Sequence, residues 1–168
     1  MKRAHWLVTA CLAALCGCAR LPAPMPPPAQ KAQPSRSSHY ALMRERAADE
    51  RIVAGIDREI HDDWRWAGRR AVLRYGVDES QGVQFDVVLV IPHEFVRAGG
   101  RKIDVRIDGR LLGSIAADQA GYQAWKRPVP EEWLAPGRDI TVELLADAEW
   151  MQGNEKRGYM LNGAGFTL

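Results

Sequence analysis

Cysteine is nearly absent from this sequence: its 168 residues contain three, and all three lie within the first 18. From residue 19 onward the chain therefore has no disulfide, no thiol nucleophile and no thiolate ligand for a metal ion. A chain of about 150 residues buries a core that is large enough to fold without disulfides. The lack of cysteine thus excludes thiol catalysis and thiolate metal binding. It is compatible with either a reducing or an oxidising compartment.

Long hydrophobic runs are also missing. The most apolar stretch runs from Ala4 to Cys18, which is shorter than the roughly 20 residues that a membrane-spanning helix needs. It follows Lys2 and Arg3, and it ends in Leu15-Cys16-Gly17-Cys18. A charged start, a short apolar centre and a small residue before the end are typical of a secretory signal peptide.

The ending Leu15-Cys16-Gly17-Cys18 resembles the lipobox of bacterial lipoproteins, in which a peptidase cuts before the last cysteine and a lipid is attached to its sulfur. The resemblance implies a signal peptide over residues 1–17 and a covalent lipid on Cys18 that anchors the protein in the bacterial cell envelope. Ala19, where other lipoproteins carry aspartate, is similar to proteins sent to the outer membrane, so we expect an anchor there facing the periplasm. A cytosolic protein with a fortuitous apolar start is the alternative.

A surplus of charge of either sign is absent once the signal peptide is removed. Residues 1–17 contain Lys2 and Arg3 and no acid, so removing them leaves 21 basic and 21 acidic residues. No basic surplus remains to neutralise phosphates, which argues against nucleic acid as a partner.

Residues 18–38 are rich in proline and poor in large apolar side chains. Six of the ten prolines fall there. Such a composition cannot bury a core and favours extended conformations, so we interpret the stretch as a tether between the membrane and the domain 39–168. A proline-rich recognition segment is the alternative.

Within residues 39–168 the pattern predicts a mainly β protein. Residues 40–52 hold strong helix formers and predict one short N-terminal helix. From His61 onward apolar residues alternate with period two, and Asp108-Gly109 between alternating runs predicts a tight hairpin. Gly121 to Pro136 is expected to be rich in loops. The fold class we expect is a single antiparallel β-sandwich, jelly-roll-like, with predicted strands that include 83–91, 102–107, 110–115, 140–145 and 159–168.

No catalytic or metal site is predicted. The sequence has no G-x-S-x-G motif, and the neighbours His61, Asp62 and Asp63 would point to alternating faces of a strand, which does not suit a shared metal ion. A glycosidase needs two carboxylates across a cleft, and no pair stands out among the candidate acids. These candidates are Asp118, Glu131, Glu132, Asp147 and Glu149.

Aromatic residues are the more informative group. Five tryptophans follow the signal peptide, and Trp64 with Trp66 are expected on one strand face in the core. We predict Tyr122, Trp125 and Trp150 as ligand-binding residues, because indole and phenol faces suit the apolar side of a sugar ring. Core packing is the alternative for each of them. Apart from the lipid on Cys18, no cofactor is expected.

The runs Trp64-Arg65-Trp66, Val105 to Arg110 and Leu161 to Phe166 carry a second resemblance. It is to the β-sandwich modules of bacterial envelope and glycosyltransferase-associated proteins, over residues 61–168. We therefore expect a non-catalytic, lipid-anchored module that binds an envelope protein or a glycan. The alternatives are a small hydrolase of envelope polysaccharide or peptidoglycan, and a purely structural lipoprotein.

Overall fold

The structure, a computed structural model, describes residues 39–168. The predicted signal peptide, Cys18 and the tether lie outside this range. Within it, no helix is long and apolar enough to cross a membrane.

Strands make up most of the described chain, and all of their pairings are antiparallel. Eleven strands occur in chain order: β1 Tyr40–Leu42, β2 Ile52–Ile56, β3 Arg65–Val77, β4 Gln84–Ile91, β5 Lys102–Ile107, β6 Arg110–Ala116, β7 Gly121–Pro128, β8 Arg138–Ala146, β9 Trp150–Gln152, β10 Glu155–Arg157 and β11 Tyr159–Thr167. One short helix, α1 His93–Arg97, follows β4, and 3₁₀ helices span Arg46–Glu50 and Glu131–Trp133. The predicted mainly β, antiparallel domain is confirmed.

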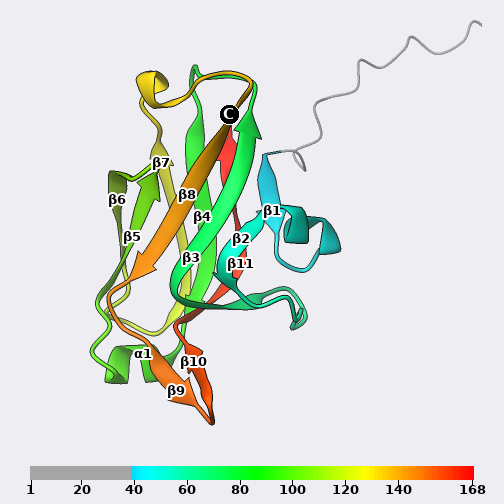
Figure 1. The fold of residues 1–168 in the computed structure, drawn as a ribbon. Helices are drawn as coiled ribbons and strands as arrows, with labels where there is room; N and C mark the ends of the chain where they lie inside the picture. Colours follow the sequence, from blue (N-terminus) through cyan, green and yellow to red (C-terminus); the bar gives the residue numbers. More distant parts are fainter. Residues whose placement is uncertain (1–38) are drawn as a thin grey trace, which may run out of the picture. The chain divides into compact units, whose positions relative to one another are not determined.

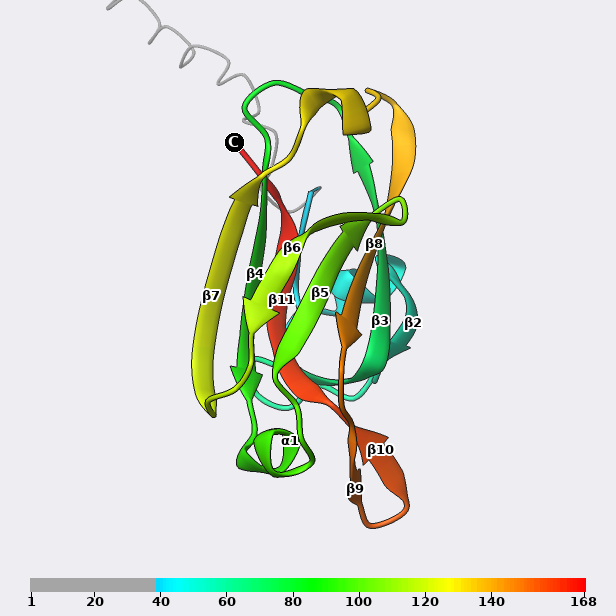
Figure 2. The ribbon, with the colours of Figure 1, turned by 90° about the vertical axis from the view of Figure 1, so that its left-hand side faces the viewer.

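Nine strands form one sheet that folds over into two layers (Figures 1 and 2). We call β2, β3, β8, β5 and β6 the first layer, and β1, β11, β4 and β7 the second layer. The layers join where the start of β3 pairs with the start of β11, Ala67 opposite Tyr159. Farther along, β3 pairs with β8 instead. β9 and β10 form a separate hairpin that projects at one end (Figure 1). The arrangement fits the predicted β-sandwich.

The core follows the period-two pattern of the sequence. On β4, Phe85, Val87, Leu89 and Ile91 are all buried between the layers, while the residues between them are half-buried on the outer face. The facing strands β5 and β8 alternate in the same way. Removing this apolar area from water is the main stabilising contribution, at about 25 cal/mol per Å².

The hairpin predicted at Asp108-Gly109 is confirmed: β5 pairs with β6, and both turn residues have positive φ, 47° and 79°. This matches the right-handed twist of the flanking strands. The loop-rich interpretation of residues 121–136 is wrong for its first half, because Gly121–Pro128 forms β7 along β4.

The helix predicted over residues 40–52 is wrong in type and extent. Tyr40–Leu42 pairs with β11, only Arg46–Glu50 is helical and of 3₁₀ type, and Ile52–Ile56 pairs with β3. Pairing with an existing sheet satisfies the backbone along the whole segment, whereas an isolated helix of this length is marginal.

The segment between β1 and β2 is held by Arg65, which is fully buried at the start of β3. Its guanidinium donates to the carbonyl oxygens of Met43 at 2.7 Å and Glu45 at 3.0 Å, and it forms an ion pair with Asp49. The hydrogen bond from Arg65 holds the pKa of the Asp49 carboxyl below its usual value. This buried cation therefore ties the 3₁₀ helix to the sheet.

Asp49→Asn tests the contribution of this ion pair. We expect the free energy of unfolding at pH 7 to fall by about 2 kcal/mol, because the buried guanidinium loses its charged partner. The folded-state pKa of Asp49 is depressed, so its stabilisation is present above the unfolded-state pKa of about 3.9 and is lost as pH falls through the folded-state value. Denaturant unfolding between pH 7 and pH 2 should show the gap between wild type and variant closing in acid.

Glu50→Gln is the matched control, because Glu50 is exposed on the same 3₁₀ helix and forms no ion pair within the described chain. Equal unfolding curves for the two variants would contradict the role given to Arg65 and Asp49.

Candidate ligand-binding face

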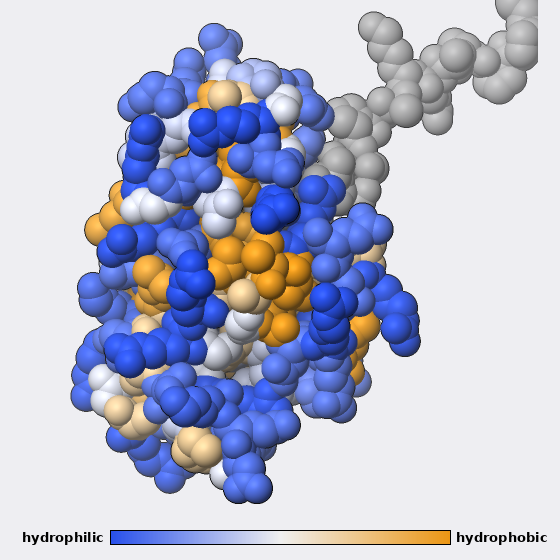
Figure 3. All heavy atoms as spheres, viewed as in Figure 1, coloured by the Kyte–Doolittle hydropathy of each residue, from blue (hydrophilic) through white to orange (hydrophobic). Residues whose placement is uncertain are grey.

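The outer faces of the two layers differ in how their charged side chains are paired. On the first layer the charges compensate one another: Lys102 lies 3.1 Å from Asp104, Ser114 donates to the same carboxylate at 2.6 Å, and Arg70 pairs with Glu143. The hydrogen bond from Ser114, and then Lys102, lower the pKa of Asp104. In Figure 3 the hydrophobic atoms of this side gather around β2, and polar side chains surround them. Several charged groups of this face are therefore paired with one another.

The outer face of the second layer is organised by the register of its four strands. Tyr40 on β1, Gly165 on β11, Asp86 on β4 and Lys126 on β7 are successive cross-strand partners, so they form one row across the layer. The next row holds Leu42, Gly163, Val88 and Ala124. β11 thus contributes no side chain at the middle of either row.

The two glycines allow Tyr40 to lie across β11. A Cβ atom at Gly163 would come within 2.8 Å of the Tyr40 ring and its hydroxyl oxygen, and one at Gly165 within 2.3 Å of the His39 carbonyl oxygen. At Gly165 the clash is with backbone atoms and excludes a side chain, and at Gly163 a side chain would displace the Tyr40 ring. The phenol therefore occupies the space that side chains on β11 would otherwise fill.

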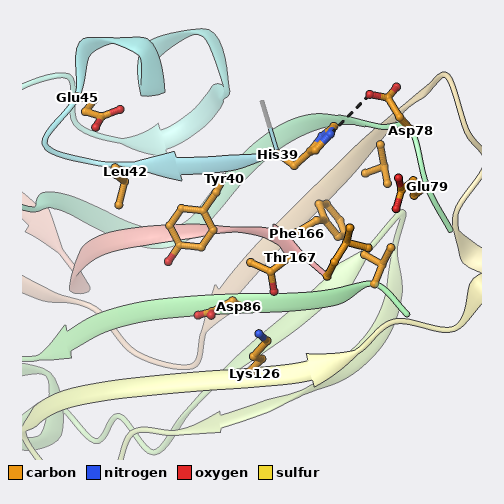
Figure 4. Close-up of a pocket in the computed structure, with 13 residues that line it drawn as sticks. His39, Tyr40, Leu42, Glu45, Asp78, Glu79, Asp86, Lys126, Phe166 and Thr167 are labelled. Carbon is orange, nitrogen blue, oxygen red and sulfur yellow. Dashed lines mark ion pairs between the residues drawn. The ribbon is translucent and has the colours of Figure 1, made fainter. Parts of the chain in front are cut away.

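A groove of about 670 Å³ opens on this face (Figure 4). Its walls come from β1, the end of β3 and its connection to β4, Asp86 on β4, Lys126 on β7, and the C-terminal end of β11, and core side chains such as Phe166 reach its floor. The lining residues are His39, Tyr40, Leu42, Glu45, Val77, Asp78, Glu79, Val83, Asp86, Lys126, Phe166, Thr167 and Leu168. One end is closed by His39, whose Nδ1–H donates to the Gly76 carbonyl at 2.7 Å while Nε2 lies 3.6 Å from Asp78.

Asp86 and Lys126 stand in the groove without a mutual ion pair. They are cross-strand partners, yet neither takes part in an ion pair or a side-chain hydrogen bond among residues 39–168. Burial, then the nearby Asp86 carboxylate and Tyr122, raise the pKa of Tyr40 above its usual value, so its hydroxyl stays protonated at neutral pH. The row thus presents a hydroxyl, a carboxylate and an ammonium to solvent side by side.

The structure places the predicted residue Tyr122 on this same outer face. It lies on β7 with 66% of its surface exposed, opposite Val90. Its proximity to the phenol of Tyr40 contributes to the raised pKa of Tyr40. Tyr122 is the one predicted ligand-binding residue next to the groove.

Trp125 lies on the opposite face of β7, because residues three apart on a strand point to opposite sides. Its indole fills the seam between β7 and β6, where a Cβ atom at Gly113 would come within 3.0 Å of it. Arg127 covers the ring at 5.5 Å, and the indole Nε1 is buried without a partner within the described part of the chain. These contacts are those of a packing residue.

Trp150 belongs to a row of aromatic rings near the projecting hairpin. Its ring centroid lies 5.9 Å from that of Trp66, which lies 4.9 Å from Trp64, and Trp64 stacks on His61 at 4.6 Å. Arg157 lies over Trp66 at 5.2 Å and forms ion pairs with Asp57 and Glu155. The row fixes the β9–β10 hairpin on the sheet, so the structure does not bring Tyr122, Trp125 and Trp150 together.

Sequence reasoning missed Tyr40, Asp86 and Lys126. Asp86 is the only charged residue in the run Val83 to Ile91, and that isolated charge was a readable signal. Its relation to the other two depends on strand register, which one sequence does not reveal.

Among the described residues, no group of His, Cys, Asp and Glu is arranged to hold a metal ion.

No family model matches the chain, and neither does any curated protein. Several solved structures are similar to it at low identity. The CBM36-1 domain of a multidomain xylanase from the hindgut metagenome of Trinervitermes trinervoides is 13% identical, with a TM-score of 0.45, over 75% of this chain and 94% of that one. A family 35 carbohydrate binding module from Clostridium thermocellum is 8% identical (TM-score 0.43) over 76% and 96% of the two chains. A CBM35 from Cellvibrio japonicus is 13% identical (TM-score 0.39) over 82% and 90%.

Alanine substitutions at Trp125 and Tyr122 separate packing from exposure on one strand. We expect Trp125→Ala to lower the free energy of unfolding by about 2–3 kcal/mol, because it leaves a cavity in the seam between β6 and β7. Tyr122→Ala should change it by no more than about 0.5 kcal/mol, since its side chain is mostly in water. Chemical denaturation of both variants measures the difference. A loss for Tyr122→Ala as large as that for Trp125→Ala would show that the two side chains are not placed as described.

Proposed function

We propose that the domain is a non-catalytic module that binds a glycan on the outer face of its second layer. The observation that carries the proposal is the row of Tyr40, Asp86 and Lys126, in which hydrogen-bonding groups stand unpaired beside an aromatic ring. A sugar offers a C–H face that packs on aromatic and apolar surface, and hydroxyls that need fixed donors and acceptors. Leu42 and Val88 in the next row add the apolar surface.

The individual roles follow from the chemistry of each group. The Asp86 carboxylate accepts hydrogen bonds from sugar hydroxyls, and the Lys126 ammonium donates to them. Bonds of this kind to charged groups contribute about 1.5–3 kcal/mol each. Tyr122, exposed on the outer face of β7, provides a phenol face beside the groove. Thr167 adds a hydroxyl from β11.

The carboxylates considered for a hydrolase do not form a catalytic pair in the structure. Asp118, Glu131, Glu132 and Asp147 are all exposed, and Asp147 accepts from the backbone N–H groups of Arg101 and Lys102 at 3.0–3.2 Å. Glu149 pairs with Lys156 at 2.9 Å. These acids are engaged in local structure or solvated, which does not favour the two-carboxylate geometry of glycoside hydrolysis.

A survey of glycans followed by calorimetry tests the proposal, using the full chain purified in detergent. We expect at least one envelope or cell-surface glycan to bind, and both Asp86→Ala and Tyr122→Ala to weaken that binding at least tenfold, because each removes a direct contact. The controls are Asp118→Ala and Leu111→Ala, exposed residues that do not line the groove. They should stay within twofold of wild type.

Two outcomes would contradict the proposal. If no glycan binds, the binding function is wrong. If a glycan binds equally to wild type and to both groove variants, the outer face of the second layer is not the site. The purely structural alternative predicts the first of these outcomes.

We further propose that the module is held at the bacterial outer membrane, facing the periplasm, by a lipid on Cys18. The support is the Leu15-Cys16-Gly17-Cys18 ending and the proline-rich residues 18–38 that separate Cys18 from the domain.

Labelling with palmitate tests the anchor. Cells that produce the wild-type chain should incorporate the label into it and retain it in the membrane fraction, whereas Cys18→Ser should remove the label. Cys16→Ser serves as the control, because this cysteine would leave with the signal peptide. Equal labelling of wild type and Cys18→Ser would contradict lipid attachment at Cys18.

A further inference from the structure

The charges that line the groove are unbalanced. Four carboxylates face it, from Glu45, Asp78, Glu79 and Asp86, against one ammonium from Lys126 and the imidazole of His39. Only Asp78 has an ionic partner among the described residues, namely His39 at 3.6 Å. Glu45, Glu79 and Asp86 form no ion pair among residues 39–168, and Lys126, the cross-strand partner of Asp86, is the one ammonium that lines the groove with them. The groove therefore carries a negative field, and walls of low dielectric concentrate such a field.

A second feature of the groove also favours a cation. The Tyr40 ring lies across Gly163 and Gly165 at the base of β1, next to Asp86. An ammonium group is attracted both by the face of an aromatic ring and by a carboxylate. The two attractions here come from adjacent positions in one cross-strand row, Tyr40 and Asp86 on either side of Gly165.

We propose that the groove prefers glycans that carry free amino groups over neutral glycans, and neutral glycans over those that carry carboxylates or phosphates. The inference rests on the proposed glycan-binding function and specifies its ligand class. A protonated amine on the sugar supplies the positive charge that the unpaired carboxylates lack. A uronic acid or a phosphorylated sugar meets the same carboxylates as like charges, with Lys126 as the only ammonium to receive it.

Three tetrasaccharides of equal length serve as probes: β-1,4-linked glucosamine with free amines, the fully N-acetylated counterpart, and a tetramer of galacturonic acid. Their affinities for the full chain in detergent are measured by calorimetry at pH 6, where the amines are largely protonated. We expect the glucosamine tetramer to bind at least tenfold more tightly than the N-acetylated one, and the galacturonic acid tetramer to bind most weakly. Raising the salt from about 20 mM to 200 mM should shrink the preference, because it shortens the screening length.

Asp86→Asn is the decisive variant, since the amide keeps an acceptor oxygen and removes the charge. We expect it to weaken binding of the glucosamine tetramer at least fivefold more than binding of the N-acetylated tetramer, because both lose the charged acceptor and only the amine loses the attraction between opposite charges. Asp118→Asn, exposed between β6 and β7 and outside the groove lining, is the matched control and should leave the preference unchanged. An unchanged unfolding midpoint confirms that each variant is folded.

The outcomes separate this inference from the proposed function. Equal affinity for the amine and N-acetylated tetramers, tighter binding of the galacturonic acid tetramer, or a preference that survives Asp86→Asn overturns the amine selectivity and leaves glycan binding in place. Failure to bind any of the three, while the glycan survey yields a ligand, also overturns it. Failure of every glycan overturns the proposed function itself.

Discussion

The close approach of β1 to β11 is the constraint on which the candidate site depends. Gly163 and Gly165 of β11 have no side chains, so β1 and the ring of Tyr40 can lie directly against β11. Any larger residue would meet backbone or ring atoms within 3 Å, well inside van der Waals contact. The groove is bounded by what this contact brings together: the phenol of Tyr40 on one side, and the outward side chains of β4 and β7 on the other. The site thus depends on the lack of side chains at two positions in the middle of β11.

Much of the fold was predictable because it depends on local pattern. Alternation over Val83–Ile91 and the Asp108-Gly109 turn are properties of a few consecutive residues, and the structure confirms both. The failure at residues 40–52 has a tertiary cause: helix formers there lost to pairing with β11 and to the buried guanidinium of Arg65. Local propensity amounts to only tenths of a kcal/mol per residue, which sheet pairing readily overrides.

The candidate site was predictable only in part, for a related reason. Tyr122 was predicted from its aromatic ring in a stretch interpreted as rich in loops, although that stretch is strand β7. Tyr40, Asp86 and Lys126 are 40 to 86 residues apart, and only the register of four strands places them in one row. A single sequence shows which face of a strand a residue takes, but not which residue of another strand lies beside it. The same period-two rule, applied to β7 as a strand, would have placed Trp125 and Tyr122 on opposite sides.

The seam between β6 and β7 has a consequence for how copies of this domain behave when crowded. An unpaired strand edge is a template on which another chain can add a strand, and it is the usual starting point of aggregation in β proteins. Here the edges of the two layers lie close together, with the indole of Trp125 wedged between them under Gly113. The remaining edge strands are short or irregular: β1 has three residues, and the pairing of β2 has two register shifts, one at Val53 and one at Gly55. The packing of Trp125 between β6 and β7 therefore leaves neither strand as an isolated straight edge to which another chain could add.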